Sequence, residues 1–278
     1  MIKRYKKVLL SFLIVVVVIV SSFIILTYSS NNSLIGIDVS NSINIRFSSI
    51  SSEGYNYFNQ SYIKAVHYIG NNTAFYEGKP VIIFIGAEWC PYCNAESWAL
   101  LIALERFGNI TGLQYMESSS SDIFPNTHGF SFTNVNYSSK YISFLEYEYQ
   151  DRNYQPLQPV PQNIYKLWMN LTHGSIPFIY IAGHFYQAGS NIYPGILAGK
   201  NWTYIISQIS NKSSPIAKAI YTSANILTAM ICQADGNHPS YVCDQELIQH
   251  IEQDLLQLPL QPLLYLSSNE DFWVTQKA

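Results

Sequence analysis

The segment KPVIIFIGAEWCPYC, residues 79–93, decides the fold. Residues 81–85 are five consecutive β-branched or aromatic apolar residues, which is typical of a strand buried on both faces of a sheet. Cys90 and Cys93 follow, separated by a proline and a tyrosine. Residues 94–108 then place apolar side chains at helical spacing and end at a glycine. We therefore predict a strand, a two-cysteine turn and a helix, in that order, within an α/β fold.

The predicted position of Cys90 has a chemical consequence. A cysteine at the N-terminal end of a helix lies beside unpaired backbone N–H groups and the positive end of the helix dipole, and both favour thiolate over thiol. Cys93 follows one helical turn later, so it can close a disulfide with Cys90 and resolve a mixed disulfide formed there. The pair is therefore predicted to be catalytic and redox-active. It needs no dissociable cofactor, because the sulfur atoms themselves carry the electrons.

Two other interpretations of the first pair stay open. Cys90 and Cys93 could form an inert structural disulfide, or they could bind a metal ion. A zinc site would need two more soft ligands, and the later cysteines are spaced unlike paired zinc knuckles. A copper-handling protein would combine Cys90 and Cys93 with one of three histidines, namely His128, His173 or His184.

Cys232 and Cys243 form the second pair of cysteines in the chain. We expect a structural disulfide that joins the end of one helix to the start of the next, because exported chains oxidise cysteine pairs that can approach within about 6 Å. Closing so short a loop stabilises the fold by about 2 to 3 kcal/mol. The alternative is a second redox pair that relays electrons to Cys90 and Cys93.

The N-terminus predicts a membrane anchor. Four basic residues within residues 1–7 precede an uncharged apolar run that starts at Val8 and is long enough, at about 20 residues, to cross a bilayer as a helix. We therefore expect a cytoplasmic segment over residues 1–7, a transmembrane anchor over residues 8–28, and an extracytoplasmic location for the remainder. A cleaved signal peptide is the alternative, but the run is longer than an ordinary signal core and no cleavage site follows it.

Composition agrees with export and argues against nucleic-acid binding. Charged residues make up 12% of the chain, the net charge is −3, and no basic cluster occurs beyond residue 7. So few ionisable groups would limit self-repulsion in an acidic medium. Asn-x-Ser/Thr sequons, which can be glycosylated in an exported chain, occur at Asn31, Asn59, Asn71, Asn109, Asn136, Asn170, Asn201 and Asn211.

The rest of the chain is divided by its patterning. We predict a linker over residues 29–54 (with a strand near 43–47 as an alternative), a main domain over 55–212, a helical extension over 213–260 and a C-terminal tail over 261–278. Helices are predicted within 55–68 and over 162–171, 202–209, 215–231 and 244–256. Strands are predicted within 112–118 and 140–150, a loop over 123–134, and a hairpin within 173–189 that turns at Gly183.

Residues 79–93 resemble the active-site strand and turn of the thioredoxin superfamily. GSIPFIYI, residues 174–181, resembles the second signature of that superfamily, in which Pro177 would be a cis-proline facing the disulfide. The resemblance implies that Ile176 and Pro177 bind the extended chain of a substrate and that Trp89 and Tyr92 shape the rim of the site. Together, the anchor, both signatures and the late cysteine pair resemble archaeal membrane-anchored thioredoxin-like proteins of unassigned function, domain-of-unknown-function family 929.

The chain departs from the thioredoxin pattern in two ways. Phe84 stands where thioredoxins bury an acidic residue beneath the active site, so the usual proton acceptor for the resolving thiol is missing unless Glu88 or Glu96 points inward. The separation between Cys93 and Pro177 also implies an insertion, which we place within residues 115–172. The expected fold is therefore an α/β thioredoxin-like fold with this insertion and a helical C-terminal extension.

These patterns predict a membrane-anchored, extracytoplasmic thiol–disulfide oxidoreductase. Its partners would be the thiols or disulfides of exported proteins and a membrane protein that reoxidises or rereduces it. The motif leaves open whether it acts as an oxidase, an isomerase or a reductase. The alternative from another class is a non-catalytic binding or assembly module in which the Cys90–Cys93 disulfide is permanent, and Phe84 favours that alternative.

Overall fold

The computed structural model describes residues 13–22 and 34–261, and the chain divides into two units, Met1–Ile37 and Asp38–Ala278. In the first unit, residues 13–22 are helical. The rest of the predicted anchor, the basic segment 1–7 and most of the tail, 262–278, lie outside the described residues. Among the residues that are described, no helix combines the length and the apolar character needed to span a bilayer.

The second unit is built around strand β3 (Lys79–Gly86). β8 (Ser143–Glu148) pairs with it in parallel on one side, and β9 (Phe178–Ile181) pairs with it in antiparallel fashion on the other. The side chains of residues 81–85 are all buried, as expected for a central strand. The predicted strand is confirmed, and the fold is a mixed α/β fold.

Three shorter strands complete the six-stranded sheet. β10 (Phe185–Ala188) forms the predicted hairpin with β9, and β1 (Val66–Tyr68) pairs with β10 at the edge. β2 (Phe75–Tyr76) pairs with the first residues of β3. The strand order β1-β10-β9-β3 places β3 in the interior of the sheet, since β8 pairs with its other side. The turn that follows β3 therefore starts from an interior strand.

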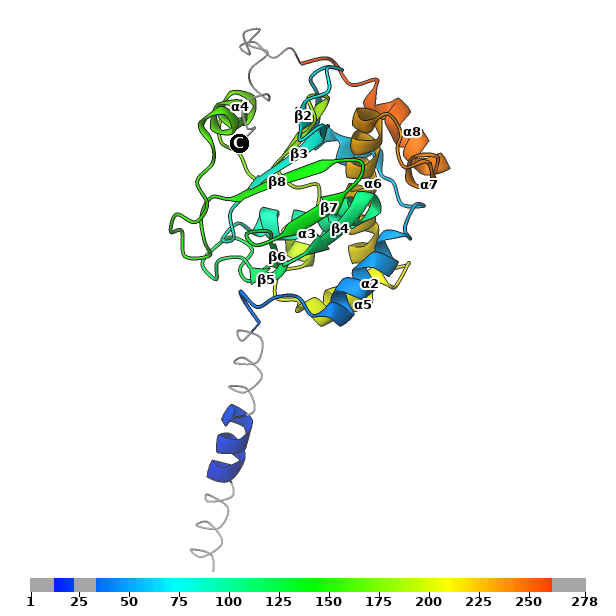
Figure 1. Ribbon diagram of the computed structural model, residues 1–278. Coiled ribbons are helices and arrows are strands. Elements are labelled where there is room, and N and C mark those ends of the chain that lie inside the picture. The colour runs from blue at the N-terminus through cyan, green and yellow to red at the C-terminus, as the bar shows by residue number, and fades with distance from the viewer. Residues whose placement is uncertain (1–12, 23–33, 262–278) are drawn as a thin grey trace, which may run out of the picture. The chain divides into compact units, whose positions relative to one another are not determined.

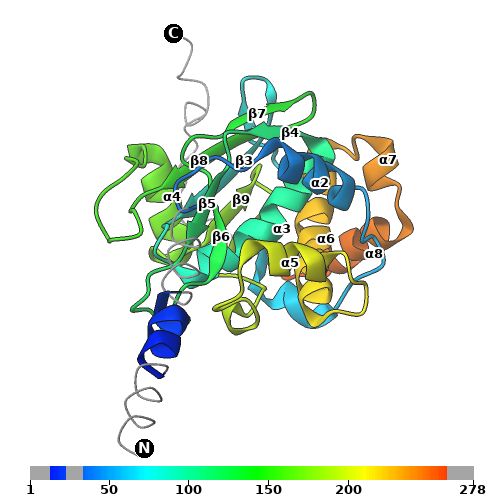
Figure 2. The same cartoon turned by 90° about the horizontal axis from the view of Figure 1, so that it is seen from below.

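Helices cover both faces of this sheet. α3 (Pro91–Phe107) and α6 (Pro215–Asp235) pack along each other on one side, and α4 (Gln162–Thr172) lies on the other side (Figures 1 and 2). The three helices were predicted at these places. α6 is not a peripheral extension, however, because it contacts β3 and β9 as well as α3.

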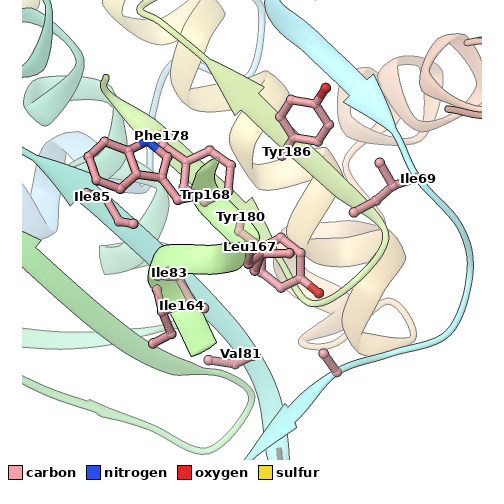
Figure 3. Packing of buried hydrophobic residues seen from close by; sticks show 11 residues of the cluster. Ile69, Val81, Ile83, Ile85, Ile164, Leu167, Trp168, Phe178, Tyr180 and Tyr186 are labelled. Carbon is pink, nitrogen blue, oxygen red and sulfur yellow. The ribbon is translucent and has the colours of Figure 1, made fainter. Parts of the chain in front are cut away.

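Alternation along β3 divides its side chains between the two helical layers. Val81, Ile83 and Ile85 point toward α4 and pack with Leu167 and Trp168 (Figure 3). The residues between them point toward α3 and α6, because successive side chains of a strand face opposite sides. A residue of a neighbouring strand that pairs with an even-numbered residue of β3 has its side chain on the same face of the sheet. That side chain therefore also points toward α3.

Two small hairpin-like sheets lie between α3 and β8 in the chain. β4 (Gly108–Thr111) pairs with β7 (Asn136–Ser139), and β5 (Gln114–Glu117) pairs with β6 (His128–Ser131). The prediction of a loop over 123–134 is thus wrong at β6. The sequence of this strand contains a glycine and shows no alternation of polar and apolar residues, so it gave no strand signal. Packing on α3 holds this strand in place, since Trp98 Nε1 donates a hydrogen bond to the His128 carbonyl oxygen (2.8 Å).

The segment predicted as a linker, with a possible strand near residues 43–47, contains helix α2 (Asn41–Ser51). Its Asn- and Ser-rich sequence has weak helix propensity, so tertiary packing explains the helix. The ring of Phe47 is buried against Trp98, with centroids 5.8 Å apart. Arg106 Nε donates to the carbonyl oxygen of Ser51 (2.9 Å) and fixes the end of α2.

The remaining elements are short apart from α5 (Trp202–Ile209) and α8 (Glu246–Leu255), which match the predicted helices. A 3₁₀ helix, η1 (Gln60–Ala65), and then β1 replace the helix predicted within 55–68. Another 3₁₀ turn, η2 (Pro194–Ile196), precedes α5, and α7 (Ser240–Cys243) precedes α8.

The predicted disulfide between Cys232 and Cys243 is present. Cys232 near the end of α6 is bonded to Cys243 at the end of α7, with Cα atoms 5.6 Å apart. Both sulfur atoms are buried, and the bond ties α7 and the following helix α8 to α6.

Buried carboxyl groups make the stability of the fold depend on pH. Burial raises the pKa values of Glu105, Glu146, Asp235 and Glu252 to about 7. None of the four is in an ion pair within the described part of the chain. Their folded-state pKa values exceed the unfolded ones, so the stabilisation is complete below about pH 4.5 and is lost as pH rises through about 7.

We expect the free energy of unfolding to be higher at pH 5.5 than at pH 8.0, by at least about 2 kcal/mol after allowance for partial exposure. Urea denaturation at the two pH values measures this difference. Burial lowers the pKa of His128 to about 4, which opposes the carboxyl effect below pH 6.5 and sets the acid limit of stability. Equal or greater stability at pH 8.0 would contradict this account of the buried carboxyls.

Candidate functional site

The two free cysteines lie where β3 passes into α3. Cys90 is the N-cap residue of α3, Pro91 occupies the first helical position, and the backbone N–H of Cys93 donates a hydrogen bond to Cys90 Sγ (3.3 Å). The predicted position of Cys90 at a helix N-terminus is confirmed. Both thiols are free and each residue is only 3% exposed, so a reacting partner must reach a recessed sulfur atom.

The two cysteines differ in environment. Burial raises the pKa of the Cys93 thiol well above its usual range, and the neighbouring Cys90 and the carboxyl group of Glu148 raise it further. Cys93 therefore holds its proton firmly. If it is to act as a nucleophile, a nearby base has to accept that proton.

Glu148 is a buried carboxyl residue near Cys93 that sequence patterning did not identify. It ends β8 and pairs with Gly86 of β3, which places its side chain on the same face as Phe84, toward α3. The carboxyl group is buried, and its Oε2 atom has no hydrogen-bond partner among the described residues. Burial, followed by the charge of Glu88, raises its pKa well above the usual range.

Phe84 and Gly86 make room for this carboxyl group. A Cβ atom added at Gly86 would lie 2.4 Å from Phe84 Cζ and 3.1 Å from Glu148 Oε2. The phenyl ring therefore lies over the bare backbone of Gly86, and Glu148 approaches from the neighbouring strand. A buried carboxyl group thus lies on the same face of the sheet as Phe84, two residues further along and on another strand.

Glu88 and Glu96 were the two sequence candidates for that role. Glu88 is buried and accepts a hydrogen bond from Ser131 Oγ (2.8 Å), and burial raises its pKa. Glu96 is also buried, but its carboxylate accepts hydrogen bonds from Ser223 Oγ (2.5 Å) and from the loop that follows β10. Glu96 is therefore engaged in holding α3, α6 and this loop together.

The structure also places the two residues expected to shape the rim, Trp89 and Tyr92, and the two expected to bind the substrate chain, Ile176 and Pro177. The ring of Trp89 stacks on Tyr154 (centroids 4.9 Å apart) and its Nε1 donates to Gln150 Oε1 (3.0 Å). Tyr92 is partly exposed on the first turn of α3. The Ile176–Pro177 peptide bond is cis, as the resemblance implied, and it directly precedes β9 beside the central strand.

The three histidines considered as copper ligands have other neighbours. His128 Nε2 lies 3.3 Å from Glu117 Oε2, His184 Nε2 lies 2.9 Å from Thr73 Oγ1, and His173 ends α4. Within residues 13–22 and 34–261, no three His, Cys, Asp or Glu side chains form a group that could hold a metal ion.

A protein-family model matches residues 65–233, well over half of the chain. The chain belongs to the family described as Domain of unknown function (DUF929). No curated protein and no solved structure shows significant similarity to it.

The DUF929 match contains every part of the candidate site. It starts at the end of η1, includes both free cysteines, Glu148 and Pro177, and ends within α6, one residue after Cys232. The disulfide to Cys243 therefore joins the DUF929 segment to the residues that follow it. α2 lies before the match, although it packs on α3.

The crowding at Gly86 gives a direct test of this geometry. We expect Gly86→Ala to lower the free energy of unfolding by about 2 kcal/mol, because the methyl group overlaps the Phe84 ring. In the Phe84→Leu/Gly86→Ala double variant the shorter side chain should relieve part of this cost, so the two effects should not add. Urea denaturation of the four proteins measures the coupling. Strictly additive effects would show that Phe84 does not occupy the space above Gly86.

Proposed function

We propose that this chain is a membrane-anchored thiol–disulfide oxidoreductase that acts on exported proteins outside the cytoplasmic membrane. The observation that carries the proposal is the arrangement of two free cysteines at the N-terminus of α3, near the buried carboxyl group of Glu148. The Oε2 atom of this group has no hydrogen-bond partner among the described residues, and the charge of the group raises the pKa of Cys93. A purely structural cysteine pair would not need a buried carboxyl group near it.

We also propose that the fold is thioredoxin-like. The strand order β10-β9-β3-β8, with one parallel pair at β3–β8 and antiparallel pairs elsewhere, supports this assignment. So does the distribution of α3 and α6 on one face and α4 on the other (Figure 1). In this assignment the two small sheets, over residues 108–139, are the insertion, which therefore starts and ends earlier than the expected range of 115–172. The residues of the cis Ile176–Pro177 bond bind the substrate chain.

The reaction follows from the roles of the two sulfur atoms. The Cys90 thiolate attacks one sulfur of a partner disulfide, so a mixed disulfide forms and the partner's other sulfur leaves as a thiolate. Cys93 then transfers its proton to Glu148 in its carboxylate form and attacks Cys90 Sγ, which releases the partner's second thiolate and forms the Cys90–Cys93 disulfide. Two electrons pass from the protein to the partner, and the reverse sequence transfers a disulfide to a partner dithiol.

The proposed location rests on several features of the chain. The charge-free N-terminal run predicts the anchor, and the Cys232–Cys243 disulfide is typical of an oxidising compartment. The sequon asparagines within the described residues are all exposed, and so are available to a glycosyltransferase. A membrane redox partner would restore the oxidation state of Cys90 and Cys93 between cycles.

The competing proposal, a non-catalytic binding module, depended on the loss of the buried acid at Phe84. Glu148 supplies a carboxyl group from β8 on the same face of the sheet as Phe84, so this argument against catalysis is weakened. The copper-handling alternative has no observation in its favour.

The test is to trap and time the mixed disulfide. In full-length protein, Cys93→Ser should accumulate a stable mixed disulfide with a model disulfide peptide, whereas Cys90→Ser should form none. Glu148→Gln should form the mixed disulfide but resolve it about 100-fold more slowly, because the Cys93 proton has lost its acceptor. Quenched-flow mixing followed by thiol alkylation and mass spectrometry measures both steps.

The matched control is Glu146→Gln on the same strand. Glu146 also has a pKa raised by burial, but it pairs with Phe84 rather than with Gly86. The Glu146→Gln variant should resolve the mixed disulfide at a rate within about twofold of the wild-type rate, because Glu146 takes no part in the proton transfer. Equal rates for Glu148→Gln and the wild type would remove Glu148 from the mechanism, and mixed-disulfide formation by Cys90→Ser would reassign the nucleophile.

A further inference from the structure

We propose that Tyr92, Ile123, Phe124 and Tyr193 form an apolar recognition surface beside Cys90, here called the aromatic platform. This surface binds an aromatic or aliphatic side chain next to the reacting cysteine of a polypeptide partner. The inference rests on the proposed function, because the partner is the molecule that presents its disulfide to Cys90, and it adds a class of substrate to that function.

The platform is assembled from three separate segments of the chain. Tyr92 lies between the two cysteines, Phe124 lies in the loop between β5 and β6, and Tyr193 immediately precedes η2. The Tyr92 and Phe124 rings meet edge to face with centroids 5.9 Å apart, and Phe124 and Tyr193 meet in the same way at 5.0 Å. The rings therefore form one continuous series that begins within the active-site motif.

The platform remains accessible although its rings contact one another. Tyr92 is 38%, Tyr193 61% and Ile123 75% exposed. Large apolar side chains gathered on a surface mark an interaction site more often than do single exposed ones. Aromatic residues are also the side chains most enriched among those that contribute strongly to binding.

The loop that carries Tyr193 is fixed to the helix of the cysteines. A Cβ atom at Gly195 would lie 2.5 Å from Tyr193 Cε1, so this glycine makes room for the ring. The buried carboxylate of Glu96 on α3 accepts hydrogen bonds from the Asn191 N–H (3.0 Å) and Ser190 Oγ (2.6 Å). The buried Glu96 therefore fixes the position of the Tyr193 loop relative to α3, the helix that begins at Cys90.

The loop that carries Ile123 and Phe124 is fixed in a similar way. The backbone N–H of Ser119 donates to the Trp89 carbonyl oxygen (2.9 Å), next to Cys90. At the two ends of the loop, Arg152 donates to Glu117 Oε1 (2.7 Å) and Asn126 Oδ1 (3.1 Å). Both rim loops are thus preorganised, which lowers the entropy cost of binding a partner.

The chemistry of the platform selects its ligand. None of its four side chains is charged, and the adjacent Asp122 carboxylate accepts a hydrogen bond from the Ile123 N–H. The two ring separations together span at most about three residues of extended chain. A small charged thiol such as glutathione has no apolar side chain to cover this surface. A polypeptide with an aromatic or aliphatic residue near its cysteine does, so we assign the platform to that class of partner.

The experiment compares two disulfide peptides that differ only in the residues flanking the cysteine, Phe in one and Ser in the other. Full-length reduced protein is mixed with each peptide, and the second-order rate constant of mixed-disulfide formation is measured. We expect a ratio of rate constants, Phe peptide over Ser peptide, of about 10 for the wild type, since burying one aromatic side chain at the platform is worth at least that factor. In the Ile123→Ser/Tyr193→Ser variant the ratio should fall to about 1.

Tyr241→Ser is the matched control, because Tyr241 is an exposed tyrosine on α7, a helix that packs on α6 and α8. It should keep the wild-type ratio. A ratio near 1 in the wild type, or one unchanged in the Ile123→Ser/Tyr193→Ser variant, would overturn the platform while leaving the oxidoreductase proposal intact. If the wild type reacts with neither peptide nor with glutathione disulfide, the proposed function itself fails, and the platform fails with it.

Discussion

The parallel pairing of β3 with β8 is the constraint on which the site depends. It aligns Gly86 with Glu148 and so directs a carboxyl group into the layer between the sheet and α3. Because Gly86 has no side chain, the Phe84 ring and the Glu148 carboxyl group both fit at this point. The strand that leads into the cysteines and the strand that carries this carboxyl group are therefore adjacent, and the sheet fixes their relative position more firmly than a loop could.

Burial gives the site its chemical character. A carboxyl group in such surroundings favours its neutral form, and a thiol does the same. Proton transfer from Cys93 to Glu148 therefore requires the deprotonated form of Glu148, which is less populated here than in an exposed carboxyl group. The same effect appears across the fold, where partly buried carboxyl groups without cationic partners favour acidic conditions. This trend agrees with the low charge content of the chain and with a protein that faces an acidic medium.

The sequence predicted those elements whose own periodicity is strong. β3 and α3 follow from a buried apolar run, a proline after Cys90 and a glycine that ends the helix, all of which are local signals. α2 and β6 were missed because their sequences have weak propensity, and contacts with Trp98 from elsewhere in the chain hold them in place. Glu148 was missed for a related reason. Strand register decides which face it occupies, and no pattern within either strand reveals the register between them.

The measurement that tests this account most directly is the redox potential of Cys90 and Cys93 in the full-length protein. The protein is equilibrated across a glutathione series and the disulfide is quantified by thiol alkylation, with the Cys232→Ser/Cys243→Ser variant alongside to remove the second pair. The account predicts a reversible midpoint between about −120 and −270 mV. A pair that stays oxidised below about −300 mV, or one that forms no disulfide under any condition of the series, would contradict it.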